Sequence, residues 1–170
     1  MNATRQIAHG LWPSSLGHLR VALAIEDHAR HFAEISKLDI HVTEIAPFPA
    51  LDQATGLILF RAAQEALNNV VRHAQASRVD IVLRADNDTI TLNVTDDGIG
   101  IEKASLAKAD CLGLLGLRER VIALGGALAV RRNVGAGTTV SVQMPSNPQT
   151  TSAATRSSHL RFTLPDILRQ

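Results

Sequence analysis

The segment RVDIVLRADNDTITLNVTDDGIG, residues 78–100, decides the fold. Two runs in it, 78–85 and 89–95, alternate apolar and polar residues and are joined by a short polar turn, which is the pattern of a β-hairpin. In the second run every other residue is apolar, as expected for an antiparallel sheet with one buried side. The segment therefore predicts two paired, half-buried strands.

The second of these strands ends in the sequence Asp96-Asp97-Gly98-Ile99-Gly100. Alternating glycines let a ligand come close to the backbone, and an acidic residue at the strand end offers a carboxylate acceptor. Such an acceptor suits the exocyclic amino group of adenine. An ordinary Asp-Gly turn is the competing interpretation.

Working outward from the hairpin, the periodicity of apolar residues predicts three helices and three further strands. Asp52 is a candidate N-cap for the second helix. The predicted helices are 19–37, 53–74 and 114–124, and the further strands are 39–45, 127–132 and 138–144. This order predicts an α+β two-layer sandwich, with a mixed sheet covered on one face by helices, and not a doubly wound nucleotide fold.

The composition limits the possible functions. The 170 residues carry a formal net charge of +1 and only four Phe, one Trp and no Tyr, so a nucleic-acid partner is not expected. Cys111 is the single cysteine, which excludes an internal disulfide. No apolar run reaches the roughly 20 residues of a membrane span, and we expect a cytoplasmic protein.

The second helix carries a polar stripe. Glu65, Asn69 and His73 follow one another at i to i+4 spacing and are expected to line one face. An Asn amide oxygen is a ligand that suits magnesium, which takes one or two protein oxygens and keeps several waters. A solvated helix face is the alternative interpretation.

Two further glycine-containing segments have possible roles. Residues 113–120, GLLGLRER, join a loop to a helix start, where backbone N–H groups favour phosphate oxygens. Arg118 and Arg120 could add charge, or they could lie on a solvated flank. Residues 135–138, GAGT, fit a routine glycine turn when taken alone.

Taken in order, these four segments resemble the N box and the three glycine boxes of the GHKL ATPase superfamily, which includes gyrase-type topoisomerases, Hsp90-type chaperones and histidine kinases. The segments QEALNNVVRHAQA, DDGIG, GLLGLRERVIALGG and GAGTTVSVQMP are most similar to the catalytic domain of sensor histidine kinases of the nitrate-sensor and desaturase-sensor type. The resemblance covers about residues 38–145. It implies a Bergerat-type ATP-binding fold and transfer of the γ-phosphoryl group of ATP to a histidine in two-component signal transduction.

The resemblance also implies roles for single residues. Asn69 would bind Mg²⁺ between the ATP phosphates, and Glu65, the other candidate catalytic residue, would organise the metal and its waters. The residues implied near the nucleotide are Arg72 and His73 at the phosphates, Asp96 at the adenine amino group, Gly98 and Gly100 along the base, Ile101 and Leu114 at the ends of the ATP lid, Gly113 and Gly116 as its hinges, and Thr138 at the adenine end.

The sequence departs from the family pattern in two places. Cys111 stands where the subfamily commonly has a glycine of the lid, and we expect it to be an unreactive small residue. The helical hairpin that carries the phosphoacceptor is not recognisable, and His9, His18, His28 and His31 are each interpreted as titratable surface residues.

We therefore expect an organisation in three parts: 1–37 as linker and helix, 38–145 as ATPase domain and 146–170 as a flexible tail. The chain would be a monomer whose partners are a histidine-bearing hairpin, upstream or on another chain, and indirectly a response regulator. Two other functions stay open at this point. One is a non-kinase ATPase or ATP-gated switch, and the other is a serine kinase of the anti-sigma-factor type.

Overall fold

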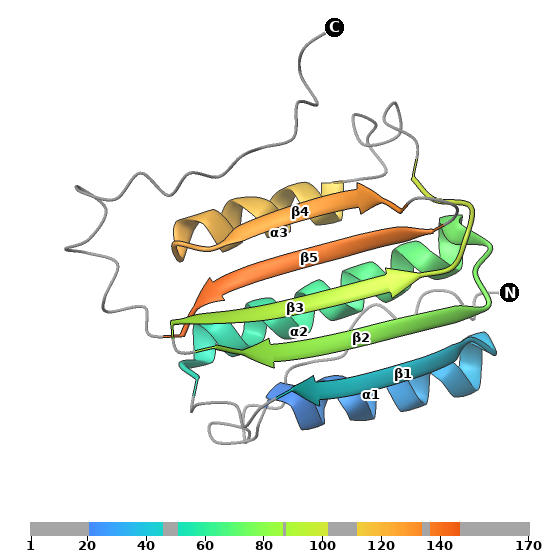
Figure 1. Cartoon of the computed structure of the whole chain (residues 1–170), viewed down its shortest axis with the longest axis horizontal. Helices are drawn as coiled ribbons and strands as arrows, with labels where there is room; N and C mark the ends of the chain where they lie inside the picture. The colour runs from blue at the N-terminus through green and yellow to red at the C-terminus, as the bar shows by residue number, and fades with distance from the viewer. Residues whose placement is uncertain (1–20, 46–50, 87, 102–111, 134–136, 147–170) are drawn as a thin grey trace, which may run out of the picture.

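The computed structural model describes residues 21–45, 51–86, 88–101, 112–133 and 137–146. Within these residues, helices lie against one face of a five-stranded sheet (Figure 1). The helical segments are α1 Val21–Ser36, α2 Gln53–Asn69, the π-helical η2 Val70–Ala74, and α3 Leu112–Ala123. The strands are β1 Asp39–Ile45, β2 Arg78–Ala85, β3 Thr89–Asp96, β4 Ala127–Arg132 and β5 Thr138–Pro145. The predicted α+β two-layer sandwich is confirmed.

The sheet is mixed, as the sequence predicts. Its strand order is β1-β2-β3-β5-β4; β1 runs parallel to β2, and every other neighbouring pair is antiparallel. Parallel strands need a crossover connection, and here α2 and η2 supply it between β1 and β2. The two hairpins, β2–β3 and β4–β5, join side by side through β3 and β5.

The β2–β3 hairpin shows why alternation decided the fold. Ile81 pairs with Val94 and Leu83 pairs with Leu92, and all four side chains are buried against the helices. The intervening residues of β3 are partly exposed on the other face. A shift of one residue in register would exchange the two faces of a strand, so burial of one face fixes the pairing.

The helical layer is held to the sheet by one continuous core. Leu59 and Leu67 of α2 have no exposed surface, and α1 adds Ile25 and Phe32 to the same cluster. On the other side of α2, Val121 of α3 is also fully buried. Each large aliphatic side chain buried in this way contributes roughly 1.5–3 kcal/mol. The core therefore fixes the elements that carry the site.

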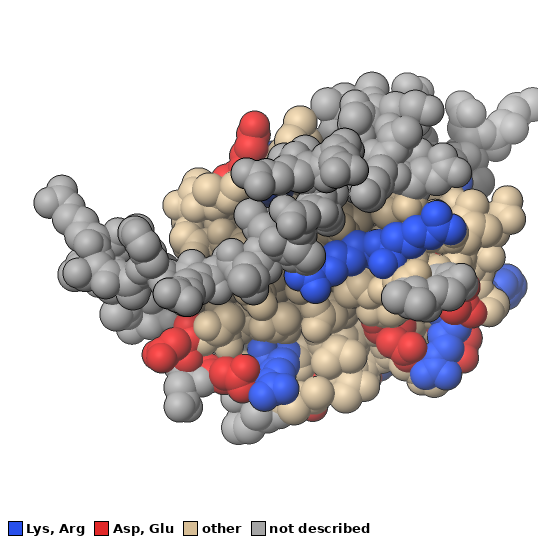
Figure 2. Space-filling view, turned by 45° about the horizontal axis from the view of Figure 1, so that its top comes forward, with Lys and Arg blue, Asp and Glu red and all other residues tan. Residues whose placement is uncertain are grey.

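The face of the sheet away from the helices is polar. Charged residues of β1 and β2 form short pairs there: Arg78 with Asp80 at 2.8 Å and His41 with Asp39 at 3.1 Å. On the face that Figure 2 shows, basic and acidic side chains lie next to one another along one border. Exposed ion pairs of this kind contribute little to stability, so the fold does not depend on them.

The predicted cap of α2 is confirmed. The Asp52 carboxylate accepts hydrogen bonds from the Thr55 backbone N–H at 2.9 Å and from the Thr55 hydroxyl at 2.6 Å. Burial works to raise the pKa of Asp52, but the hydrogen bonds from Thr55 outweigh it and lower the pKa. The cap fixes the first turn of the helix that carries Asn69 at its other end.

Several details differ from the sequence prediction. The helix expected over 53–74 is α-helical only to Asn69, and α3 begins at Leu112 instead of residue 114. His28, predicted to lie on the surface, is only partly exposed, because its ring contacts the rings of Phe32 and Phe60 at centroid distances of 5.8 and 5.5 Å. Burial and the neighbouring His31 lower the pKa of His28.

Other predictions are not tested by these residues. His9, His18, Cys111, the lid residues 102–111 and the tail from 147 onward lie outside the described residues. The division at residues 37 and 145 stays a prediction, although α1 shares its core with α2. None of the helices among the described residues has the length and hydrophobicity that a bilayer span requires.

Candidate functional site

The predicted site residues come from elements that meet at one end of the sandwich. Most of these segments lie toward the right-hand side of Figure 1: η2 after α2, the ends of β3 and β4, and the start of β5. The start of α3 lies nearer the middle of the picture. Strand pairing places Asp96 beside Val79, and Thr138 beside Arg132. The fold thus gathers four segments that are far apart in the sequence.

Asn69 is the last α-helical residue before η2 and is partly buried. Its amide nitrogen has no hydrogen-bond partner in the part of the chain that the structure describes, although the atom is shielded from solvent. A buried polar atom without a partner is costly, roughly 1–3 kcal/mol, and calls for an explanation. Turning the amide by 180° exchanges its oxygen and nitrogen, so this position can offer a ligand either a donor or an acceptor.

The π-helical turn η2 follows the polar residues of α2, and a π turn is wider than an α turn. Arg72 and His73 of η2 are both exposed, whereas Ala74 turns into the core. Gln75, with φ of 52°, then ends the helical path. The stripe of Glu65, Asn69 and His73 stays a prediction: Glu65 and Asn69 are partly buried on α2, and His73 is exposed on η2.

Asp96 lies at the end of β3 and is only 7% exposed. Its carboxylate accepts a hydrogen bond from the Gly98 backbone N–H at 2.9 Å. Burial raises the pKa of Asp96, while hydrogen bonds from the backbone of Gly98 and Thr138 oppose that change. A carboxylate buried without an ion pair is unfavourable for folding, and such groups are concentrated at functional sites.

Asp97, which the sequence interpretation left without a role, points to the start of β2 instead. Its carboxylate accepts three hydrogen bonds, from the Ser77 N–H at 2.8 Å, the Ser77 hydroxyl at 2.6 Å and the Arg78 N–H at 2.9 Å. These bonds, the hydroxyl of Ser77 first, lower the pKa of Asp97 to about 2. Asp97 joins segments 20 residues apart in the sequence, and no local pattern could have indicated it.

The glycines of the loop after β3 allow close packing against η2 and the β4–β5 turn. A side chain at Gly98 would overlap the Ala74 backbone, and the N–H of Ile99 donates to the Ala74 carbonyl at 2.8 Å. Gly137, whose φ of +85° favours glycine, lies directly against the Asp96 carbonyl. Gly98 and Gly137 thus let the backbone close around both sides of Asp96.

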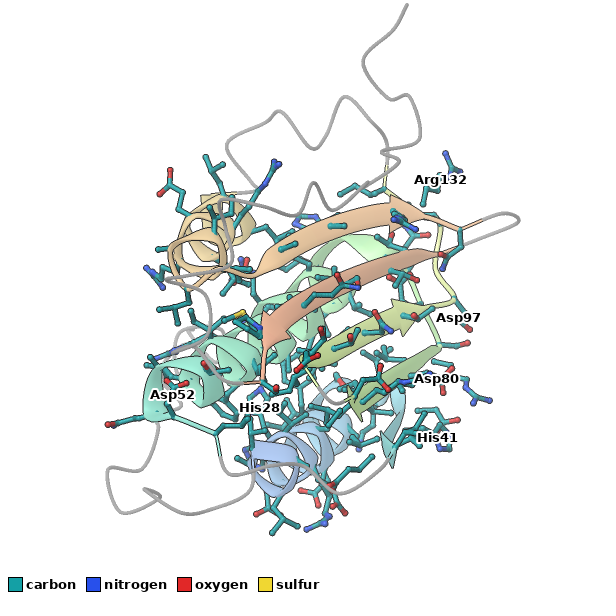
Figure 3. All side chains as sticks on the ribbon, turned by 60° about the vertical axis from the view of Figure 1, so that its left-hand side comes forward. His28, His41, Asp52, Asp80, Asp97 and Arg132 are labelled. Atoms are coloured by element: carbon teal, nitrogen blue, oxygen red, sulfur yellow. The ribbon has the colours of Figure 1, made fainter. Side chains whose placement is uncertain are left out.

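The β4–β5 hairpin also contacts the loop through side chains. The hydroxyl of Thr138 accepts a hydrogen bond from the Ile101 N–H at 3.1 Å, which brings these two predicted site residues together. The Arg132 guanidinium donates to the Ile99 carbonyl at 3.2 Å. Figure 3 shows Arg132 and Asp97 at the same end of the sheet. Sequence reasoning missed Arg132, because an arginine at the end of a strand is usually a solvated residue.

The start of α3 differs from the predicted flexible junction, because Gly113, Leu114 and Gly116 all lie within the helix. Leu114 is buried in the core. A side chain at Gly113 would overlap the carboxyl group of Glu65, so α3 begins against the catalytic candidate of α2. A Cβ added at Gly116 would meet no protein atom within 4 Å.

The site therefore combines a buried carboxylate, an unpartnered amide and a glycine-rich helix start. No group of three or more His, Cys, Asp or Glu side chains within the described residues could hold a metal ion. The arrangement suits a ligand with a hydrogen-bond donor at one end and anionic oxygens at the other. Asn69 and Glu65, one turn apart on α2, offer oxygens to a cation that arrives with that ligand.

Comparisons with known proteins agree with this chemistry. The sequence profile of the family described as "Histidine kinase-, DNA gyrase B-, and HSP90-like ATPase" matches residues 55–148. The sensor histidine kinase MctS of Rhizobium johnstonii is 34% identical over 143 residues, which are 83% of this chain and 31% of that protein. The signal transduction histidine-protein kinase/phosphatase UhpB of Salmonella typhimurium is 36% identical over 149 residues, which are 85% of this chain and 28% of that protein.

Among solved structures, the histidine kinase domain of the blue-light activated histidine kinase from Erythrobacter litoralis EL346 has a similar fold. The TM-score is 0.62 at 24% identity, and the match covers 77% of this chain and 63% of that one. The present chain spans about a third of the length of the two curated relatives. The matched region includes every described site residue named above.

Proposed function

Because the chain belongs to the histidine kinase-, DNA gyrase B- and HSP90-like ATPase family, we propose that it binds ATP together with Mg²⁺ and supplies the γ-phosphoryl group to a histidine outside the described residues. The reaction would be the kinase step of two-component signal transduction. The relatives that match over most of this chain are sensor histidine kinases. The single observation that carries the proposal is the buried Asp96 carboxylate beside the glycine-rich loop.

The described residues fit the base of ATP. Asp96 is held by a hydrogen bond from Gly98, and its second carboxylate oxygen is suited to accept from the adenine amino group. Gly98 and Gly100 let the loop pack closely against Ala74 and Gly137 beside Asp96. Ile101 and Thr138, bonded to one another, would close the adenine end. A buried acceptor that loses its donor is costly, so this end would favour adenine over bases without an amino group there.

The described residues also fit the metal. Magnesium usually keeps several waters and takes one or two protein oxygens in addition to phosphate oxygens. The unpartnered atom of Asn69 is its amide nitrogen, and turning the amide by 180° would put its oxygen in that place, where it could bind the ion. Glu65 lies one turn before Asn69 and is partly buried, so it would hold waters of that ion. When bound, the ion would neutralise charge on the phosphates during transfer.

The phosphates would lie at the start of α3. Backbone N–H groups at a helix N-terminus attract phosphate oxygens. The Glu65 carboxyl group fills the space beside Gly113, whereas the backbone at Gly116 has no described protein atom beside it. Arg72 and His73, exposed on η2, would add positive or polar contacts. Phosphoryl transfer depends mainly on positioning and charge neutralisation, so the site needs no nucleophile of its own.

The phosphoacceptor would be the histidine of a helical hairpin, upstream or on another chain. Two of the four described histidines do not fit that role: the ring of His28 packs against two phenylalanine rings, and His41 lies on strand β1 beside Asp39. A response regulator would be the indirect partner. We place this reaction in the cytoplasm, where ATP is available, either as a separate protein or as the cytoplasmic part of a membrane-bound sensor, with the present chain as a monomer.

The test is a titration with ATP in the presence of Mg²⁺. Asp96→Asn should weaken ATP binding about 10- to 100-fold, because a charged acceptor is lost from a buried hydrogen bond. The same variant should fold at least as well as wild type near neutral pH, since burial raises the Asp96 pKa and its ionised form destabilises the fold. Asn69→Ala should remove the dependence of affinity on Mg²⁺. Unchanged affinity in both variants would overturn the site.

A further inference from the structure

Arg132 has contacts that neither the sequence pattern nor the proposed chemistry explains. It is the last residue of β4, and its guanidinium donates to the carbonyl of Ile99 at 3.2 Å. Its side chain also lies over Gly100, where an added Cβ would come within 3.0 Å of the Cγ and Nε atoms of Arg132. The arginine therefore contacts the centre of the glycine-rich loop from the hairpin side.

The loop is fixed on its other side by different groups. Asp97 is bonded to Ser77 and Arg78, and the Ile99 N–H is bonded to the Ala74 carbonyl. These bonds hold the loop to η2 and β2 but leave the orientation of the next peptide, Ile99–Gly100, undetermined. Gly100 has a φ of +77°, and glycine can leave this conformation more easily than other residues.

The orientation of the Ile99–Gly100 peptide determines where its carbonyl and its N–H group point. A peptide unit is planar and trans, so fixing the direction of the Ile99 carbonyl also fixes the direction of the Gly100 N–H. The next residue, Ile101, donates its N–H to Thr138 of the same hairpin. In the pairing of β4 with β5, Thr138 lies opposite Arg132. Arg132 and Thr138 thus bind neighbouring backbone groups of the loop, the Ile99 carbonyl and the Ile101 N–H.

From this geometry we infer that Arg132 is a positioning residue of the nucleotide site, which holds the Ile99–Gly100 peptide in the orientation that the base requires. The inference rests on the proposed function, because it concerns the same loop that Asp96 begins. Arg132 acts through the backbone and touches neither the phosphates nor the metal. Its effect should consequently be the same for every adenine nucleotide, whatever the number of phosphates.

The chain supplies a matched control in Arg131. It is the preceding residue of the same strand, it has the same charge, and it is exposed. Alternation along a strand directs its side chain to the opposite face of the sheet, away from the loop. A general effect of positive charge would appear in Arg131 and Arg132 alike, whereas positioning of the peptide belongs to Arg132 alone.

The first experiment measures binding of ATP and of ADP to wild type, Arg132→Met, Arg132→Lys and Arg131→Met. Methionine keeps the aliphatic stem over Gly100 but removes the donor. We expect Arg132→Met to lose about fivefold affinity for both nucleotides, Arg132→Lys to recover part of this loss, and Arg131→Met to bind like wild type. A loss that grows from ADP to ATP would indicate a direct phosphate contact and overturn the inference, as would an equal loss in Arg131→Met.

The second experiment does not depend on nucleotide. Hydrogen exchange of the amides of residues 99–101 is followed in the ligand-free proteins, and it should be about fivefold faster in Arg132→Met than in wild type and Arg131→Met. Unchanged exchange in Arg132→Met would overturn the inference. If wild type binds no ATP, the proposed function fails, and the exchange experiment still decides whether Arg132 holds the loop.

Discussion

At the scale of single residues, polar groups of two kinds lie at the site. The exposed Asp97 carboxylate accepts hydrogen bonds from Ser77 and Arg78 and belongs to the folding of the chain. Asn69 leaves an amide without a partner and Asp96 leaves a carboxylate without an ion pair, and neither contributes to folding in an evident way. Groups that weaken the folded state without a ligand are the ones that a ligand is expected to satisfy.

Gly116 offers a test in which stability and binding change in opposite directions. It lies inside α3, and an added Cβ would meet none of the described protein atoms within 4 Å. Gly116→Ala should therefore raise the free energy of unfolding by about 0.5–1 kcal/mol, because alanine favours the helix. If the phosphates approach this backbone, the same methyl group should weaken ATP binding about tenfold.

Denaturant unfolding without nucleotide, next to an ATP titration, measures the two effects separately. A variant that is more stable and binds ATP with the affinity of wild type would show that the phosphates do not lie against Gly116. A variant that is less stable would contradict the open space at that position.

At the scale of elements, the structure shows how the end of β3 is tied to the start of β2. The Asp97 carboxylate forms that link, and its pKa is lowered to about 2. The sequence indicates the hairpin itself, because alternation marks the two strands. It does not indicate this link, since the partners of Asp97 lie 19 and 20 residues away and only the finished fold brings them together.

The link predicts a defined pH dependence of stability. Because the folded pKa of Asp97 lies below its ordinary value near 4, the stabilisation is complete above about pH 4 and is lost as the pH falls toward 2. Asp97→Asn should lower the thermal midpoint by a few degrees at pH 7, and the difference from wild type should vanish near pH 2. Thermal unfolding between pH 2 and 7 measures it.

Asp88 provides the control for that experiment, because it is an exposed aspartate at the opposite end of the same hairpin. Asp88→Asn should unfold like wild type at every pH. A difference between Asp97→Asn and wild type that stays constant down to pH 2 would show that the carboxylate charge has no part in the link.

At the scale of the whole molecule, the sequence predicted the two layers and the two hairpins, because these follow from periodicity and turn residues; the roles of the site residues stay predictions. It did not predict the π turn after Asn69, the partial burial of His28 or the contact of Arg132 with Ile99. The contacts of His28 and Arg132 join segments far apart in the chain. The π turn lies at Val70 and Val71, where the apolar pattern of the helix continues and gives no sign of a wider turn.

The whole chain also determines whether phosphoryl transfer needs a second component. The described residues form one layer of helices on one sheet, and in the proposed reaction the site binds the phosphoryl donor while the acceptor histidine belongs to a separate hairpin. With labelled ATP and Mg²⁺, we expect the chain alone to acquire negligible label. Addition of a histidine-bearing hairpin fragment from a related sensor kinase should give a label on the hairpin that is labile in acid and stable in base, and Asp96→Asn should abolish it. Such a label on the chain itself would show that its acceptor lies within these 170 residues, whereas an acid-stable label on a partner protein would favour a serine kinase.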